Sequence, residues 1–343
     1  MDKGLVAPKV LLGLVLLLVH IHAACTAQSS DQTGESQGAQ KPFVVTTVSP
    51  ITSIVENIGG SRINIEGIVP EGVNSHTFEP SPSVARLISR ADLIVANGLL
   101  LEEPTLELAE ANKKPTAPIL LLGDNTVARQ EWQFDFSFPE SEGHPNPHLW
   151  PNPLHALRYA ELVHDALVKL DPEGSDYYTK NLSTFKERTK VLDRGIMQSV
   201  QTIPANQRKL LTYHDSWAYF AKRYGMQVVG AVQPSDFSEP SAREVSELIN
   251  QLRKEKVPAV FGSEVFPSKI LEQIAKEGGA KYIDKLRDDD LPGKPGDPRH
   301  TYLGLVLENM ENMIPALGGN VDALKDFNPG VVFEGKSQAV YPQ

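Results

Sequence analysis

The sequence contains a single cysteine among its 343 residues, so a disulfide bond within the chain is excluded. It also lacks a basic cluster, because 33 Lys and Arg stand against 43 Asp and Glu and the formal net charge is −10. A surface that neutralises a phosphate backbone needs concentrated positive charge, so nucleic acid is not expected as a partner. The HExxH pattern of many zinc hydrolases is absent as well.

The most continuous apolar run lies near the N-terminus, where a lysine precedes VLLGLVLLLV. This run is too short to span a bilayer stably and is followed by small residues, which predicts an export signal over 1–25. Cys25 stands where a bacterial lipoprotein signal places the residue that receives lipid. An ordinary cleavage site near Ala24 or Ala27 is the alternative.

Residues 26–41 are polar and rich in Gly, Ser and Gln, a composition that predicts a flexible tether. If Cys25 is acylated, this tether holds the folded part of the chain off a membrane surface. The sequence therefore predicts an exported, lipid-anchored protein.

From Phe43 onward, short apolar runs such as FVVTTV and APILLLG alternate with helical patterns, and the alternation restarts after Pro204. Near-continuous apolar strands separated by helices are typical of parallel sheets covered on both faces. Between the two halves, SDYYTKNLSTFKERTKVLDRGIMQSVQ carries one long helical pattern. The sequence thus predicts the α/β class, with similar lobes over 42–172 and 204–343, a connecting helix over 173–203, and a crevice between the lobes.

Histidines and one aspartate follow predicted strands of both lobes. His76 comes shortly after INIEGIVP, His214 follows RKLLTY, and His148 lies in the proline-rich turn EGHPNPHLWPNP after APILLLG. Asp284 ends KYID. Ligands of open parallel sheets bind beyond the carboxyl ends of the strands. Because imidazole and carboxylate groups suit a divalent transition metal, we expect these four side chains to form a metal site.

The other histidines after the export signal are expected to have no role as main ligands. His155 and His164 belong to the helical stripe that begins at Leu154, and we interpret them as structural. His144 and His300 lie in loops, where solvent exposure is expected and recruitment of metal is the alternative.

Four segments resemble, in order and spacing, the metal-binding segments of the cluster A-I solute-binding proteins, the zinc and manganese receptors of ABC importers. The segments are VPEGVNSHTFEPSPS, NPHLWPNP, YHDSWAYFAKRYG and YIDKL. The resemblance covers nearly the whole chain from residue 43 to about residue 317. It implies that the metal ligands are His76, His148, His214 and Asp284.

The resemblance further implies a monomeric receptor in the periplasm or at the cell surface that delivers metal to an ABC permease in the membrane. In this family the position of His214 is commonly histidine in zinc receptors and glutamate in manganese receptors, so zinc is expected, with manganese or iron as the alternative. Glu264 matches a family glutamate near the site. We expect it to accept a hydrogen bond from a ligand imidazole, or alternatively to lie on the surface at a strand end.

Two other classes of function compete with a metal receptor. A secreted zinc hydrolase could use three histidines and a carboxylate, but catalytic zinc needs an open position for water and a general base nearby. Four protein ligands would leave zinc closed to water, which favours a receptor over an enzyme. A surface adhesin would fit an anchored acidic protein, but no sequence feature argues for it.

Overall fold

The computed structural model describes residues 41–343, except for 234–236, 266–268 and 337–338. The predicted export signal, Cys25 and nearly all of the predicted tether lie outside the described residues. In the part of the chain that is described, no helix combines the length and apolar character that crossing a bilayer requires.

The first sheet consists of five strands: β1 (Phe43–Thr46), β2 (Asn64–Gly67), β3 (Leu93–Ala96), β4 (Ile119–Leu121) and β9 (Ala339–Val340). Their order is β4-β3-β1-β2-β9, and every neighbouring pair is parallel. Each residue of β3 is buried, as expected for a central strand with helices on both faces of the sheet.

The second sheet consists of four strands: β5 (Lys209–Thr212), β6 (Gln227–Ala231), β7 (Ala259–Phe261) and β8 (Lys281–Ile283). Their order is β6-β5-β7-β8, and all neighbours are again parallel. The predicted α/β class with two parallel-sheet lobes is therefore confirmed.

The α-helices of the described residues are α1 (Ser49–Gly59), α2 (Pro82–Ile88), α3 (Glu103–Asn112), α4 (Pro153–Leu170), α5 (Ser175–Gln201), α6 (Ala218–Tyr224), α7 (Ala242–Glu255), α8 (Lys269–Gly278) and α9 (Tyr302–Ala316). Side-chain oxygens of Asn152, Ser241 and Thr301 cap the N-termini of α4, α7 and α9. These caps satisfy backbone N–H groups that the first turn of a helix leaves without partners.

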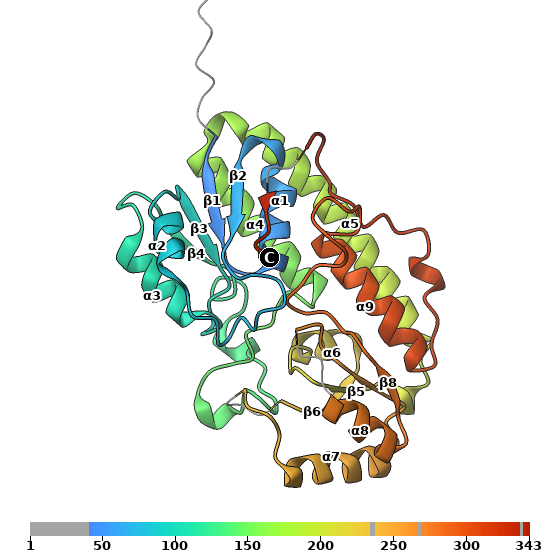
Figure 1. Cartoon of the computed structure of the whole chain (residues 1–343). Helices are drawn as coiled ribbons and strands as arrows, with labels where there is room; N and C mark the ends of the chain where they lie inside the picture. The colour runs from blue at the N-terminus through green and yellow to red at the C-terminus, as the bar shows by residue number, and fades with distance from the viewer. Residues whose placement is uncertain (1–40, 234–236, 266–268, 337–338) are drawn as a thin grey trace, which may run out of the picture. The chain divides into compact units, whose positions relative to one another are not determined.

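The long helix predicted between the lobes is confirmed as α5, which extends over 27 residues. It contacts α1 and α4 of the first lobe and also α6 and α9, so it joins elements from both halves of the sequence (Figure 1). Phe185, Leu192 and Ile196 lie on its fully buried face. Because this long amphipathic helix packs against helices of both lobes, it forms a stiff connection between the lobes.

The predicted second lobe, residues 204–343, needs one correction. Its last strand, β9, pairs in parallel with β2 and thus extends the first sheet. The physical reason is that β2 would otherwise leave one edge of the first sheet without backbone partners. The C-terminal residues therefore return to the first lobe.

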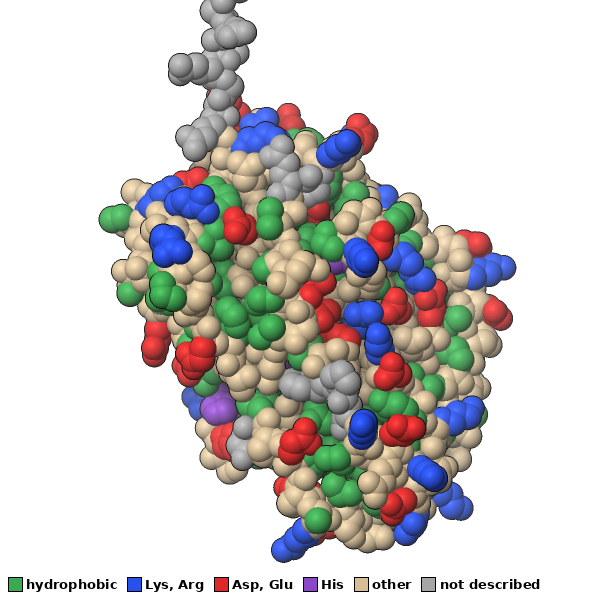
Figure 2. All heavy atoms as spheres, viewed as in Figure 1, with side chains coloured by type: hydrophobic (Ala, Val, Ile, Leu, Met, Phe, Trp, Pro, Cys, Tyr) green, Lys and Arg blue, Asp and Glu red, His purple; other side chains and the backbone are tan. Residues whose placement is uncertain are grey.

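Acidic and basic side chains are interspersed over the face of the molecule in Figure 2. The negative net charge of the chain is therefore not gathered into one continuous patch on that face.

Candidate metal centre

Three histidines from three separate loops meet at one point. His76 follows β2, His148 lies between β4 and α4, and His214 follows β5. The Nε2 atom of His148 lies 3.1 Å from Nε2 of His76 and 3.0 Å from Nε2 of His214. One nitrogen from each ring lies within 4.8 Å of the others. The structure thus brings together the three histidines that the strand ends pointed to.

The proline-rich turn holds His148 in a fixed backbone conformation. Pro153 opens α4, and the Asn152 side chain caps the helix by accepting a hydrogen bond from the N–H of Leu154. Trp150 belongs to the same turn and is fully buried, so its side chain anchors the turn in the protein core. Because proline restricts φ, little conformational freedom remains to be lost when a ligand binds at His148.

Two amide side chains determine which ring nitrogens carry hydrogen. Nδ1 of His148 lies 2.7 Å from Oδ1 of Asn146, and Nδ1 of His214 lies 2.6 Å from Oε1 of Gln233. The Asn146 side-chain N–H groups donate to Asp135 and to the backbone oxygen of Asp215, which fixes its oxygen toward His148. With Nδ1 donating, the Nε2 atoms carry lone pairs and are free to bind a metal.

Burial favours the uncharged form of two of these rings, His76 and His148. It lowers the pKa of His76 and His148 well below the ordinary histidine value, and the neighbouring His214 lowers it further. Nitrogen lone pairs about 3 Å apart repel one another unless a cation or a proton lies between them. The site is therefore arranged to receive positive charge.

The expected carboxylate of the site needs correction. β8 ends at Ile283, and the next residue, Asp284, is exposed and accepts a hydrogen bond from the Tyr282 hydroxyl at 3.2 Å. The chain then turns inward, so that Asp288 is buried with its Oδ2 3.5 Å from Nε2 of His214. Among the described residues this oxygen has no hydrogen-bond partner. The structure thus places Asp288, rather than Asp284, beside the histidines.

Glu264 holds the backbone of this inward turn through hydrogen bonds. Its Oε1 accepts hydrogen bonds from the backbone N–H groups of Asp288, Asp289 and Asp290 at 3.0, 3.0 and 2.9 Å. Successive N–H groups that converge on one oxygen form an anion-binding concavity. The structure therefore gives Glu264 a different role from the one expected, because it holds the backbone of the acidic segment rather than an imidazole.

The same segment is tied to the other two ligand loops. The Ser75 hydroxyl, next to His76, donates to Oδ2 of Asp289 at 3.0 Å. The Trp150 indole N–H donates to the backbone oxygen of Asp288 at 2.7 Å. The position of Asp288 is thus fixed relative to the loops that carry His76 and His148.

Replacing Glu264 by alanine is expected to weaken zinc binding by at least about tenfold, the scale of losses from residues that hold metal ligands. Three backbone N–H groups would lose their acceptor, and the acidic segment would no longer be held at the histidines. Titration of the metal-free protein with zinc against a competing chelator measures the effect. Glu272→Ala, at an exposed position of α8, is the control, and equal affinity of the two variants would contradict this role.

Replacing Asn146 by aspartate is expected to lower the free energy of unfolding of the metal-free protein by about 2 kcal/mol, because a buried donor is replaced by a charge. The new carboxylate would face Asp135, whose pKa is already raised by burial and by Asp215. Denaturant unfolding at neutral pH measures the change. Asn125→Asp, at an exposed position, is the control, and an Asn146 variant as stable as this control would argue against the network.

The remaining histidines lie outside the group. His155 packs against Tyr219, and His164 bonds to Asp165 and Thr179, in keeping with structural roles. His144 is partly exposed. The expected exposure of His300 is wrong, because this residue is 4% exposed.

His300 is buried because the C-terminal strand covers it. Its ring lies against Tyr341 with the ring centroids 4.7 Å apart, and its Nε2 lies 3.8 Å from Oε1 of Glu71. The position of His300 in a loop did not indicate that C-terminal residues would bury it.

Sequence reasoning missed Asn146 and Gln233 as partners of the ligand rings, and it missed Asp288. One signal was present for Asp288: the run DDD is flanked by Leu286 and Leu291, both of which are buried. Apolar residues on both sides of an acidic run indicate that the run enters the interior.

Two lobes whose strand-end loops bring three imidazoles and a buried aspartate together define a metal-binding solute receptor. Comparison with known proteins supports this class. The family model described as zinc-uptake complex component A, periplasmic, matches residues 44–316. The chain belongs to this family, ZnuA.

Individual relatives are named for different metals. The chain is 31% identical over 283 residues to the iron-binding protein YfeA of Yersinia pestis, covering 82% of this chain and 88% of YfeA. It is 28% identical over 294 residues to the manganese ABC transporter substrate-binding lipoprotein PsaA of Streptococcus pneumoniae, covering 84% and 93% of the two chains. The periplasmic zinc-binding protein TroA of Treponema pallidum superposes with a TM-score of 0.73 at 27% identity, covering 81% of this chain and 99% of TroA.

These comparisons establish the class of activity. The family model is named for a component of a zinc-uptake complex, PsaA for substrate binding in an ABC transporter and TroA for zinc binding, and these are names of receptors rather than of enzymes. The chain is therefore a receptor for a divalent metal rather than a zinc hydrolase.

Proposed function

We propose that the metal carried is zinc, bound by Nε2 of His76, His148 and His214 and by a carboxylate oxygen of Asp288. The observation that carries this proposal is the donor set, in which three imidazole nitrogens and one carboxyl oxygen meet at separations that one metal ion can span. Tetrahedral zinc with bonds of about 2.0–2.1 Å holds its donors roughly 3.4 Å apart. The separations among these donors are 3.1 and 3.0 Å between nitrogens and 3.5 Å between nitrogen and oxygen.

The kind of donor also favours zinc. Imidazole suits zinc, whereas manganese prefers oxygen ligands and stands low in the Irving–Williams order. Burial and the nearby Glu264 raise the pKa of Asp288, so a divalent cation bound at its unpartnered Oδ2 would stabilise the ionised carboxylate. A manganese or iron receptor is the second candidate, because YfeA and PsaA are named for these metals and share the family.

In this proposal the protein is exported, remains a monomer, and is held at a membrane by lipid on Cys25. Two observations support the anchor. One is the sequence around Cys25, and the other is the relative PsaA, whose name describes it as a lipoprotein. The bound zinc passes to an ABC permease in the same membrane.

Titration of the metal-free protein with zinc tests the proposal. We expect saturation at one zinc per chain, and zinc limitation should arrest growth of cells that lack the protein. Saturation by manganese but not by zinc would contradict the choice of metal. Failure to bind any divalent metal would contradict the function as a metal receptor.

Zinc affinity is expected to hold as the pH falls to about 6.5, the ordinary histidine pKa, and to decline only below it. The imidazoles must be neutral to bind metal, and burial lowers the pKa of His76 and His148, so protons compete only at lower pH. Competition against a chelator of known pH dependence measures this. A steady loss of affinity between about pH 7.5 and 6.5 would show that the rings titrate normally.

A further inference from the structure

The turn that follows β3 has an unusual backbone. Gly98, Leu99 and Leu100 have φ values of 77°, 51° and 63° in succession. The left-handed region is unfavourable for leucine because Cβ approaches the following carbonyl oxygen. The Glu102 carboxylate accepts the N–H groups of Asn97 and Gly98, which holds the turn in place. Backbone strain that is supported in this way points to a function for the turn.

The strained turn directs one leucine to solvent. Leu100 is 49% exposed, whereas Leu99 is 7% exposed. A large apolar side chain held outward by an unfavourable backbone contributes little to the folding of this chain. It is suited to contact another molecule.

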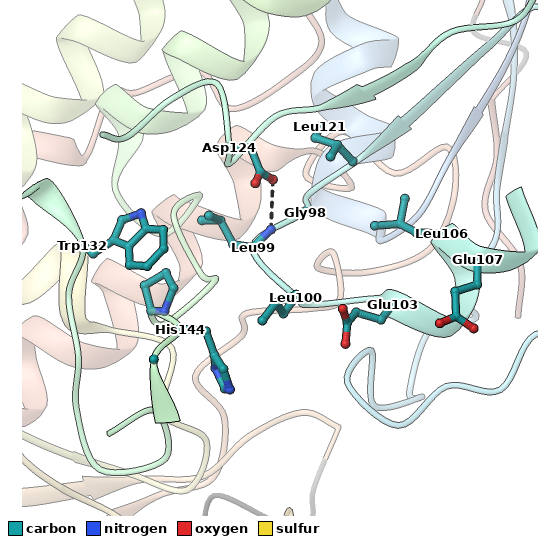
Figure 3. A pocket seen from close by; sticks show the side chains of 12 residues that line it. Gly98, Leu99, Leu100, Glu103, Leu106, Glu107, Leu121, Asp124, Trp132 and His144 are labelled. Carbon is teal, nitrogen blue, oxygen red and sulfur yellow. Dashed lines mark hydrogen bonds between the residues drawn. The ribbon is translucent and has the colours of Figure 1, made fainter. Parts of the chain in front are cut away.

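A cavity of about 360 Å³ lies beside the turn (Figure 3). We name it the Leu100 pocket. Its walls include the apolar side chains of Leu106, Leu121 and Trp132. Its carboxylates belong to Glu103, Glu107 and Asp124. No lysine or arginine is among the described residues that line it.

The Leu100 pocket adjoins the metal centre. A smaller cavity of about 90 Å³ is lined by His76 and shares Leu99 and Leu100 with the Leu100 pocket. His148 and His214 are buried, while His76 is partly exposed. Among the three rings, His76 is thus the one with the greatest exposure, and it lines the same cavity as the turn.

The charges around the pocket suit a basic partner. The lining includes three carboxylates and one imidazole, that of His144, and Arg129 lies over the Trp132 ring at 5.4 Å from its centroid. A second copy of this acidic chain would bring like charge to the same surface. A partner that presents lysine or arginine beside an apolar side chain would be complementary.

We propose that the Leu100 turn and the Leu100 pocket form the contact surface for the permease. An external loop of the permease would place an apolar side chain in the pocket and basic side chains against Glu103 and Glu107. This contact would seat the permease beside His76. The inference rests on the proposed function, since it requires a receptor that releases metal to a membrane partner.

Two variants separate this contact from folding and from metal binding. Leu100→Gly removes the exposed side chain and suits the positive φ, so it should not lower stability. Glu103→Lys with Glu107→Lys reverses the charge of the pocket. Val191→Asp on α5 alters an apolar residue of equal exposure, 49%, and Glu173→Lys with Glu187→Lys reverses exposed charges elsewhere.

The measurement is zinc uptake by cells that lack the native gene and express each variant of the full chain, together with the zinc affinity of the purified protein. We expect both test variants to lower uptake by at least about tenfold, the scale of a central interface residue, with zinc affinity unchanged. Control variants should take up zinc like the wild type.

Three other outcomes would contradict the proposal, each for a different reason. Uptake at the wild-type rate in both test variants would show that the surface does not contact the permease. An equal loss of uptake and zinc affinity would assign the turn to the metal centre. If the wild-type chain restored no uptake, the receptor function itself would be wrong.

Discussion

Asp288→Asn and His148→Ala should each weaken zinc binding by at least about tenfold. The Asp288 carboxyl group is buried with its Oδ2 3.5 Å from Nε2 of His214, and this oxygen has no hydrogen-bond partner within the described residues. His148 lies between the other two rings, so its loss removes the central donor. Competition with a zinc chelator, using metal-free protein, gives the affinities.

Two matched variants serve as controls. Asp284→Asn changes an exposed carboxylate at the end of β8, and His164→Ala changes a histidine on α4 that bonds to Thr179. Neither should alter zinc affinity. If Asp284→Asn weakened zinc binding as much as Asp288→Asn, the carboxylate ligand would have to be assigned to Asp284.

Zinc should outcompete manganese by well over about tenfold at neutral pH, and His214→Glu should narrow this preference. A carboxylate at this position makes the site harder and more anionic, which favours manganese. His214 Nε2 lies 3.0 Å from His148 Nε2 and 3.5 Å from Asp288 Oδ2, so the substitution acts on the donor set itself.

Competition dialysis with both metals measures this preference in the wild type and in His214→Glu. Gln233→Glu is measured in the same experiment, because it changes the side chain that contacts Nδ1 of His214 and leaves the imidazole ligand in place. Equal retention of zinc and manganese by the wild type, with no change in His214→Glu, would refute the choice of zinc and leave the receptor assignment intact.

The elements of the fold could largely be predicted because local patterns determine them. The apolar runs became parallel strands, and the long proline-free pattern became α5. The destination of the C-terminus could not be predicted in the same way. β9 is two residues long and joins β2, about 270 positions away in sequence, so no local pattern reports the pairing.

The site was predictable where a ligand lies close to a strand end. His214 follows β5 closely, and the prolines around His148 restrict the loop after β4, so the topology of the sheet places these rings. The same reasoning failed for Asp284, because the segment after β8 is held by Glu264 through three backbone hydrogen bonds. Contacts between distant segments decide which of several aspartates turns inward.

Anomalous diffraction at the zinc edge from crystals of the zinc-loaded protein would test the central claim most directly. We expect one strong peak bonded to Nε2 of His76, His148 and His214 and to a carboxylate oxygen of Asp288, with no water on the metal. A peak bonded to Asp284, or a zinc ion away from the three histidines, would contradict it.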